Sequence, residues 1–165
     1  MSEIFKGRYT ADAQGDFVVF LIGMRVNKLL SVRKWIPVAS AMGPMLQALY
    51  QHPDKGFLGG QTFVSWRTIL MVQYWRSFED LEKFARNADD PHLSAWRKFN
   101  QAIGSDGTVG IFHETYRVGA GQHETVYVNM PRTGMPAAMG HVPVSRQRDN
   151  ARDRMNERPM EPAHA

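Results

Sequence analysis

The sequence predicts an α+β fold of the ferredoxin-like, split βαβ kind, in which an antiparallel sheet carries its helices on one face. One observation is the order of the segments, which reads strand, helix, strand, strand, helix, strand. Another is that residues 17–24 and 69–72, both in predicted strands, lack polar alternation. A sheet with one face in water would alternate apolar and polar side chains. We therefore expect a second copy of the chain to cover this face in a homodimer.

The first predicted strand, residues 17–26, is rich in β-branched and aromatic side chains and has the length of a strand. A helical pattern follows it, with Ser31 as a candidate N-cap and apolar residues near helical spacing up to Tyr50. Pro37 and the Gly43–Pro44 pair would start or interrupt a helix, so one helix or two pieces both fit this pattern.

The remaining elements follow in regular order. Residues 57–66 are predicted as a strand with a bend or bulge at their glycine pair, and residues 68–75 as a strand with little alternation. Ser77 followed by Asp80 resembles a capping box and begins a short amphipathic helix. Three further segments are predicted: a helix at residues 91–103 and strands at residues 108–118 and 124–130.

These elements predict one domain with two flanking regions. Residues 1–16 are expected as an N-terminal extension, residues 17–142 as the ferredoxin-like domain, and residues 143–165 as a disordered, charged tail. Hydrophobic residues make up 43% of the chain and charged residues 22%, which is ordinary for a soluble globular protein.

Composition also limits the classes of function. The chain has no cysteine, which excludes disulfides, cysteine–zinc sites and a thiol nucleophile. The polar N-terminus lacks the apolar core of a signal peptide, and the longest apolar run is too short to cross a bilayer, so a cytoplasmic protein without a membrane partner is expected. The net charge is +4, but the basic residues are spread out and interleaved with acidic ones, so nucleic acid is not an expected partner.

Two histidines are the main candidates for chemistry. His92 lies in the first turn of a predicted helix, where the helix dipole favours the neutral imidazole that binds a metal or haem iron. Alternatively, it is an exposed helix-start histidine that packs against Trp96. His113 lies in the middle of a predicted strand among aliphatic residues, where it needs a hydrogen bond or a ligand. Alternatively, it is a core histidine bonded to Tyr127 or Thr115.

Aromatic residues could form the walls of a pocket near these histidines. Trp75 and Trp96 offer flat apolar surfaces that suit a planar ligand. Aromatic residues at such spacings belong more often to an ordinary core.

Three segments resemble a known family: YWRSFEDLEKFARNADDPHLSAW, IFHETYRV and YVNMPRTGM. They are similar to small fungal and bacterial proteins described as monooxygenase-like after a member of the fumagillin pathway. The resemblance covers residues 17–140 in order, and its most specific parts are the HETY and VNMP segments. It implies a dimeric α+β barrel, the architecture of antibiotic-biosynthesis and haem-degrading monooxygenases.

The same segments are also similar to the C-terminal half of haem-containing aldoxime dehydratases. That resemblance implies that His92 is the proximal haem ligand, that His113 is the distal acid–base residue, and that Asn129 matches an asparagine of the haem site. The dehydratases are double-length chains, and Val26 stands here where their pattern has a serine.

The leading hypothesis is therefore a small monooxygenase-like enzyme that binds haem and acts on a small organic substrate between sheet and helices. His92 would ligate the iron, His113 would be the catalytic group, and Trp75, Trp96 and Asn129 would line the cofactor site. The alternatives are a cofactor-independent monooxygenase with His113 as general base, a haem-dependent lyase of the aldoxime dehydratase kind, and a non-catalytic dimeric ligand-binding domain. The sequence does not identify the substrate.

Overall fold

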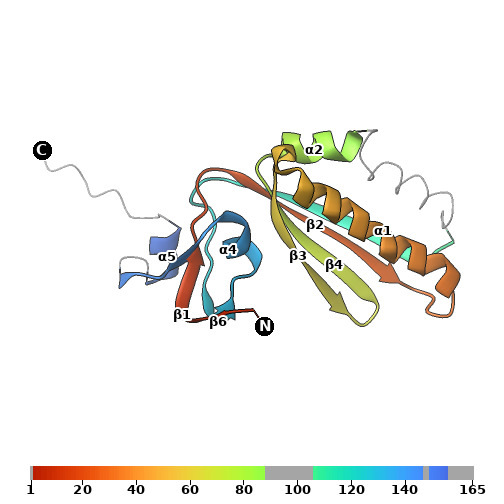
Figure 1. Cartoon of the computed structure of the whole chain (residues 1–165), viewed down its shortest axis with the longest axis horizontal. Coiled ribbons are helices and arrows are strands. Elements are labelled where there is room, and N and C mark those ends of the chain that lie inside the picture. The colour runs from red at the N-terminus through yellow and green to blue at the C-terminus, as the bar shows by residue number, and fades with distance from the viewer. Residues whose placement is uncertain (1, 88–105, 147–148, 156–165) are drawn as a thin grey trace, which may run out of the picture. The chain divides into compact units, whose positions relative to one another are not determined.

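The computed structural model describes residues 2–87, 106–146 and 149–155. The chain divides into two compact units, each described here by itself. Residues 17–117 form the first, which we call the α/β unit. Residues 1–16 and 118–165 form the second, which we call the terminal unit. The predicted domain at residues 17–142 spans the whole α/β unit and part of the terminal unit. Figure 1 labels the elements of both units.

The α/β unit has the predicted ferredoxin-like topology. Its four-stranded sheet has the order β3-β4-β2-β5, and both β2 and β3 are antiparallel to β4. The first and last strands in sequence are thus neighbours, as a split βαβ arrangement requires. The elements in chain order are β2 (Phe17–Val26), α1 (Val32–Gln51), the short 3-10 helix η1 (Pro53–Lys55), β3 (Phe57–Ser65), β4 (Thr68–Trp75), α2 (Phe78–Arg86) and β5 (Val109–Val118).

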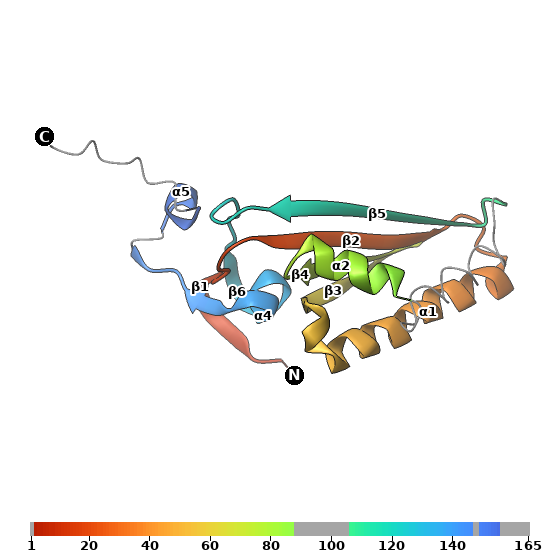
Figure 2. The ribbon, with the colours of Figure 1, turned by 90° about the horizontal axis from the view of Figure 1, so that it is seen from above.

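Both described helices of this unit pack on one face of the sheet, as predicted (Figure 2). The larger core cluster joins β2, β3 and β4 to α1 and α2, and its buried members are Val18, Leu49, Phe57, Met71, Trp75, Leu81 and Phe84. A smaller cluster of Met24, Val26 and Val109 packs against α1 nearer its N-terminus. Burial of these side chains is the main term that holds the helices to the sheet.

Helix α1 is one continuous helix, so of the two alternatives left by the sequence the single helix is correct. Pro37 and Pro44 both lie inside it, and the Ser31 side chain forms no capping hydrogen bond. Each internal proline removes one backbone hydrogen bond. The helix nevertheless continues because its apolar side packs against both core clusters, and tertiary packing contributes more to helix stability than propensity.

Local signals predicted the remaining elements of this unit well. The register of β3 against β4 shifts between Phe57 and Gly59, which is the irregularity expected at the glycine pair. The Ser77 hydroxyl accepts a hydrogen bond from the Asp80 amide at 3.1 Å, so the predicted cap of α2 is present. The predicted helix at residues 91–103 lies outside the described residues.

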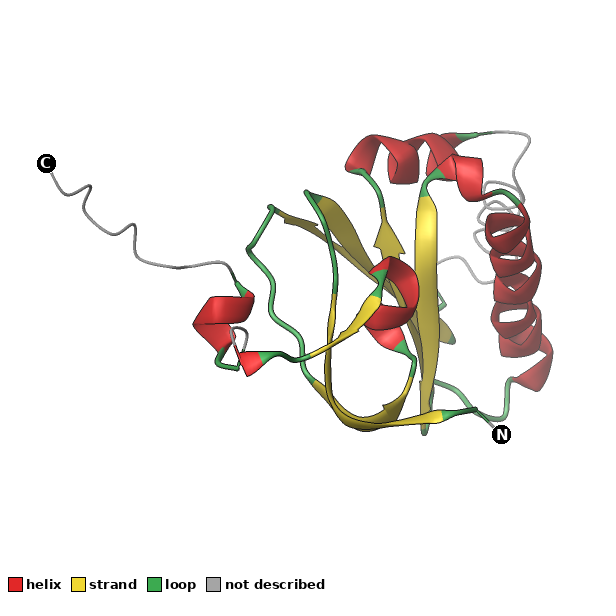
Figure 3. Cartoon of the chain, turned by 60° about the vertical axis from the view of Figure 1, so that its left-hand side comes forward, coloured by secondary structure: helices red, strands yellow, loops and turns green. Residues whose placement is uncertain are grey.

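The terminal unit differs from the sequence expectation. Residues 1–16, expected as an extension, contain β1 (Ile4–Ala11), which pairs with β6 (Tyr127–Pro131) and β7 (His141–Pro143) in a three-stranded sheet of order β6-β1-β7. Two short helices, α4 (Gly134–Met139) and α5 (Ala151–Arg154), belong to the same unit (Figure 3). Part of the segment expected as a disordered tail is therefore ordered, because it contacts residues far away in the sequence.

A β-bulge fixes the alignment of β1 on β6. Phe5 pairs with Met130 and Arg8 with Val128, so two residues of β1 lie opposite Asn129 alone. Gly7 and Asn129 both have positive φ, at 94° and 53°. The Gly7 amide donates a hydrogen bond of 2.9 Å to the Asn129 side-chain oxygen. Asn129 thus closes the bulge.

No helix in the described part of the chain is both long and apolar enough to span a bilayer.

Candidate active site

A cavity lies between the sheet and the helices of the α/β unit. Its volume is about 30 Å³. It is lined from β2, β4, α1 and α2 by Phe20, Ile22, Met42, Met45, Leu46, Leu49, Gln73, Trp75, Leu81, Phe84 and Ala85. Ten of these eleven side chains are apolar. Such a lining, with few polar groups, is typical of sites for small organic molecules.

Gln73 is the polar exception in this lining. The residue is 5% exposed and points to the helix face of β4, together with Met71 and Trp75. Its side-chain oxygen accepts a hydrogen bond from the Trp75 indole nitrogen at 2.9 Å. Its side-chain nitrogen donates to the Met71 sulfur at 3.3 Å, which is a weak acceptor. The amide is therefore held in place and keeps donor capacity that a ligand in the cavity could use.

Trp75 lines the cavity, as the sequence predicted for a pocket wall. Its side chain is fully buried at 0% exposure. The ring lies 5.5 Å from Phe57 and 5.6 Å from Phe84, measured between ring centroids. These two contacts tie β4 to β3 and α2, so Trp75 shapes the cavity and is also part of the core.

His113 lies on β5 and faces the same side of the sheet as the helices. Its ring centroid is 5.8 Å from that of Phe20, which lines the cavity. The predicted facing is therefore correct. The predicted burial is not, because the His113 side chain is exposed. β5 is an edge strand, so His113 has a neighbouring strand on one side only.

The end of β5 near His113 is attached to α2. Arg117, four residues further and on the same face, lies 4.5 Å from the ring centroid of Phe78. Its guanidinium nitrogen is 3.6 Å from a Glu79 carboxylate oxygen. Phe78 and Glu79 are the first residues of α2, so these contacts hold the His113 strand beside the helix that lines the cavity.

The other predicted site residues either lie outside the described residues or belong to the terminal unit. His92 and Trp96 lie outside the described residues. Asn129 belongs to the terminal unit, where its side chain bonds the Gly7 amide. No group of three or more histidine, aspartate or glutamate side chains among the described residues could hold a metal ion. The sequence did not predict Gln73 as a site residue. It could have been recognised as the one amide side chain among the residues of β4 that face the helices.

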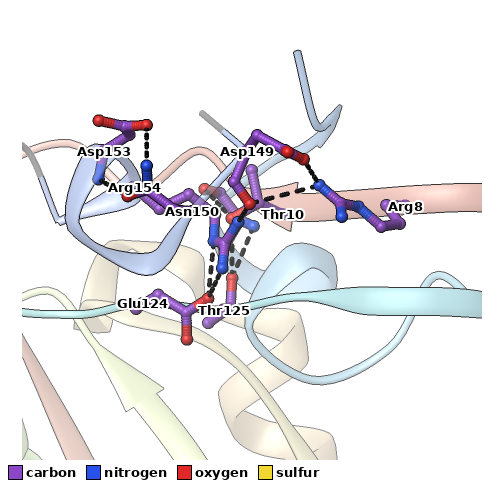
Figure 4. Close-up of polar contacts among 9 residues, drawn as sticks. Arg8, Thr10, Glu124, Thr125, Asp149, Asn150, Asp153 and Arg154 are labelled. Carbon is purple, nitrogen blue, oxygen red and sulfur yellow. Dashed lines mark hydrogen bonds and ion pairs between the residues drawn. The ribbon is translucent and has the colours of Figure 1, made fainter. Parts of the chain in front are cut away.

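The terminal unit contains a second, polar cluster (Figure 4). The Arg154 guanidinium forms an ion pair with Glu124 and donates to the Asp149 carbonyl at 2.6 Å. Arg8 forms an ion pair with the Asp149 side chain, and the Thr125 hydroxyl accepts from the Ala11 amide at 2.9 Å. These contacts join β1, the 119–126 loop and α5.

The polar cluster borders a cavity of about 10 Å³, with room for about one water molecule. Burial lowers the pKa of His123, which lines this cavity, and keeps its imidazole neutral near pH 7. The polar cluster holds together segments that are distant in the sequence. The larger, apolar cavity of the α/β unit is the better candidate for an active site.

Comparison with known proteins supports a relationship for the part of the chain that contains this cavity. The model of a family described as "Monooxygenase af470-like" matches residues 17–135. Monooxygenase af470 of Aspergillus fumigatus is 29% identical over 153 aligned positions, which represent 78% of this chain and 53% of that protein. The chain thus spans about half the length of this curated relative.

Among solved structures, aldoxime dehydratase aligns with a TM-score of 0.62 and 16% identity, over 84% of this chain and 44% of its own. SnoaB, a cofactor-independent oxygenase from Streptomyces nogalater, aligns with a TM-score of 0.45 and 10% identity, over 61% of this chain and 91% of its own. The first likeness confirms at the level of fold the resemblance expected from the sequence. The second is weaker and adds nothing to it.

Proposed function

Because this chain belongs to the Monooxygenase af470-like family, we propose that it is a small monooxygenase that oxidises an organic substrate between the sheet and the helices of its α/β unit. The observation that carries the proposal is the cavity between β2, β4, α1 and α2, with an apolar lining and one buried amide. The lining favours a largely apolar substrate, and the Gln73 amide would hydrogen-bond its carbonyl or hydroxyl oxygen.

His113 is the group that we assign to proton transfer. It lies on the cavity side of the sheet, and Phe20 contacts both the cavity and the His113 ring. A substrate that extends past Phe20 would bring an acidic C–H bond to the imidazole, which is the side chain most often used as a general base.

The substrate itself supplies the electrons in this chemistry. His113 removes a proton from a CH₂ group activated by neighbouring electron-rich groups, and the resulting carbanion reduces dioxygen. One oxygen atom ends as a carbonyl on that carbon. The other leaves as water with the two hydrogens that the carbon has lost, so the carbon loses four electrons and dioxygen gains four.

Haem is the cofactor that the sequence resemblance implies, with His92 as its ligand, and the described residues do not form a site for it. None of the described lining side chains is charged, so none could pair with the haem propionates. We derive no step through haem, and the role of His92 remains a prediction.

Oxygen uptake by haem-free protein tests this function. Protein that has been treated with a chelator and shows no Soret band is expected to consume oxygen with electron-rich phenolic or hydroaromatic ketone probes. Gln73→Leu should raise KM by about 10-fold, because one hydrogen bond to the substrate is lost. Gln47→Leu, an exposed change on α1, should leave KM unaltered. Uptake that requires added haemin, or no uptake with any probe, would show the cofactor-free chemistry to be wrong.

We also propose that the active form is a homodimer in which the sheet face without helices meets a second copy. Phe112 packs on Gly23 on this face, and the register places Phe63, Leu70 and Gly23 side by side across the strands. Phe63 is 46% exposed and Phe112 39% exposed. The chain lengths agree with a dimer. This chain aligns with 53% of its curated relative and with 44% of aldoxime dehydratase, so two copies of it come close to the length of either protein.

Sedimentation analysis tests the homodimer. Wild type is expected at twice the monomer mass, and Phe63→Glu is expected as a monomer, because a charge on the buried face of an interface is costly. Val64→Glu is the matched control. It is the next residue of β3, it points to the helix face, and it is 74% exposed, so the dimer should persist. A monomeric wild type would rule the proposal out.

A further inference from the structure

Positive charge is concentrated in one part of the α/β unit. Residues 17–78 contain one acidic residue, Asp54, and seven basic residues: Arg25, Lys28, Arg33, Lys34, Lys55, Arg67 and Arg76. The net charge of the whole chain is only +4, so the rest of the chain is negative in balance. A region of one sign attracts partners of the opposite sign.

Exposed apolar side chains lie at one end of the same region. Leu30, in the loop between β2 and α1, is 98% exposed. Trp66, in the turn between β3 and β4, is 84% exposed, and its neighbour Val64 is 74% exposed. A single exposed apolar side chain needs no explanation, but several of them together among basic residues indicate an interaction surface.

Hydrogen bonds place the loop and the turn side by side. The Val26 amide donates to the Arg67 carbonyl at 2.8 Å, and the Arg67 guanidinium donates to the Asn27 carbonyl at 3.4 Å. The paired residues Arg25 and Thr68 bring both segments to the same end of the strands. We call residues 27–32 and 64–67 the tip patch.

Hydrogen bonds to neighbouring segments fix the backbone of the tip patch. The Asn27 amide donates to the Thr108 carbonyl at 2.9 Å, and the Trp35 indole donates to the Leu29 carbonyl at 3.0 Å. Trp66 has a φ of 48°, a left-handed conformation that is unfavourable for a bulky residue. This backbone holds the indole in solvent, where the guanidinium carbon of Arg67 lies 5.9 Å from the ring centroid.

We propose that the tip patch binds the surface of an anionic lipid bilayer. Leu30, Val64 and Trp66 would enter the interfacial layer, where tryptophan is favoured, and the basic residues around them would meet the lipid headgroups. Within the described chain, Arg33 forms no ion pair with a carboxylate, so its charge is available for headgroups. This proposal departs from the sequence expectation, which was of no membrane partner.

Charge complementarity is what favours a bilayer over a protein partner. Trp66 is followed by Arg67, and Leu30 lies between Lys28 and Arg33 in the sequence. Such a mixture of apolar and basic side chains is usual in a peripheral membrane surface, in which apolar burial and electrostatic attraction add. Membrane docking is separate from catalysis, so it can be correct or wrong independently of the proposed oxygenase activity.

Co-sedimentation of the full chain with vesicles tests the proposal. Wild type is expected to bind vesicles of phosphatidylcholine mixed with phosphatidylglycerol, and to bind pure phosphatidylcholine far more weakly. Leu30→Ser combined with Trp66→Ser should lower the partition coefficient more than ~10-fold. Val126→Ser combined with Val128→Ser is the matched control, since these side chains are 45% and 51% exposed in the terminal unit.

The charge contribution is tested separately. Arg33→Gln should weaken binding to the anionic vesicles by roughly fivefold. Lys83→Gln removes the same charge from an exposed position elsewhere and should have little effect. Circular dichroism and Tm should show that all variants are folded. Wild type that stays in the supernatant with anionic vesicles, or tip-patch variants that bind as wild type does, would overturn the proposal.

Discussion

Replacing Trp75 by alanine is expected to lower the free energy of unfolding by about 3–5 kcal/mol, the usual cost of removing a large buried aromatic side chain. Trp75 has no exposed surface and packs against Phe57 and Phe84. Its removal leaves a cavity beside one that already exists, and the Gln73 oxygen loses its indole donor. Both the new cavity and the lost hydrogen bond lower the free energy of unfolding.

Urea unfolding followed by far-UV circular dichroism measures this effect, because that signal does not depend on the tryptophan removed. Trp66→Ala is the matched control. Trp66 is 84% exposed, so the expected change is within about 0.5 kcal/mol. Trp75→Phe should fall in between, since most of the ring volume returns but the Gln73 oxygen stays unpaired, at a cost of about 1–3 kcal/mol. Similar losses for Trp75→Ala and Trp66→Ala would mean that Trp75 is not the centre of this core.

His113→Ala is expected to reduce oxygen consumption by about 10²–10⁴-fold, the usual contribution of a positioned general base. The reason is its place on the cavity side of β5, beside Phe20. The free energy of unfolding should change by no more than about 0.5 kcal/mol, because the side chain is exposed in the described structure.

The two readouts separate a catalytic role from a structural one. His52→Ala is the control, since the His52 side chain is exposed at the end of α1 and is not among the residues that line the cavity. It should retain full activity. If His113→Ala lowers stability but turnover survives, His113 is structural and the proposed base is wrong.

Short-range patterns predicted the α/β unit closely. The bounds of β2 and β4 follow from runs of β-branched and aromatic residues, and the start of α2 follows from its Ser77 cap. The facing of His113 followed from the alternation of side chains along a strand. Each of these depends on residues within a few positions of one another, and such interactions can be recognised in a single sequence.

Long-range interactions could not be recognised in this way. Arg154 bonds Glu124 across 30 positions, and Gly7 bonds Asn129 across 122, so neither the ordered part of the tail nor β1 has a local signal. Gln73 is polar in an apolar strand, and only the three-dimensional structure shows that its amide borders a cavity. The burial of His113 was misjudged because its aliphatic neighbours along the strand suggested a core position, although the predicted topology already places this strand at the edge of the sheet.

The central place of β1 in the terminal sheet has a consequence for biosynthesis. β1 is made well before both of its partners, β6 and β7, which come from residues 127–143. Domains generally fold as the chain emerges from the ribosome. Both edges of β1 therefore stay unpaired by β6 and β7 while residues 17–117, the α/β unit, are synthesised. Lys6 and Arg8 interrupt its apolar residues, and such charges disfavour the pairing of an exposed strand with another chain.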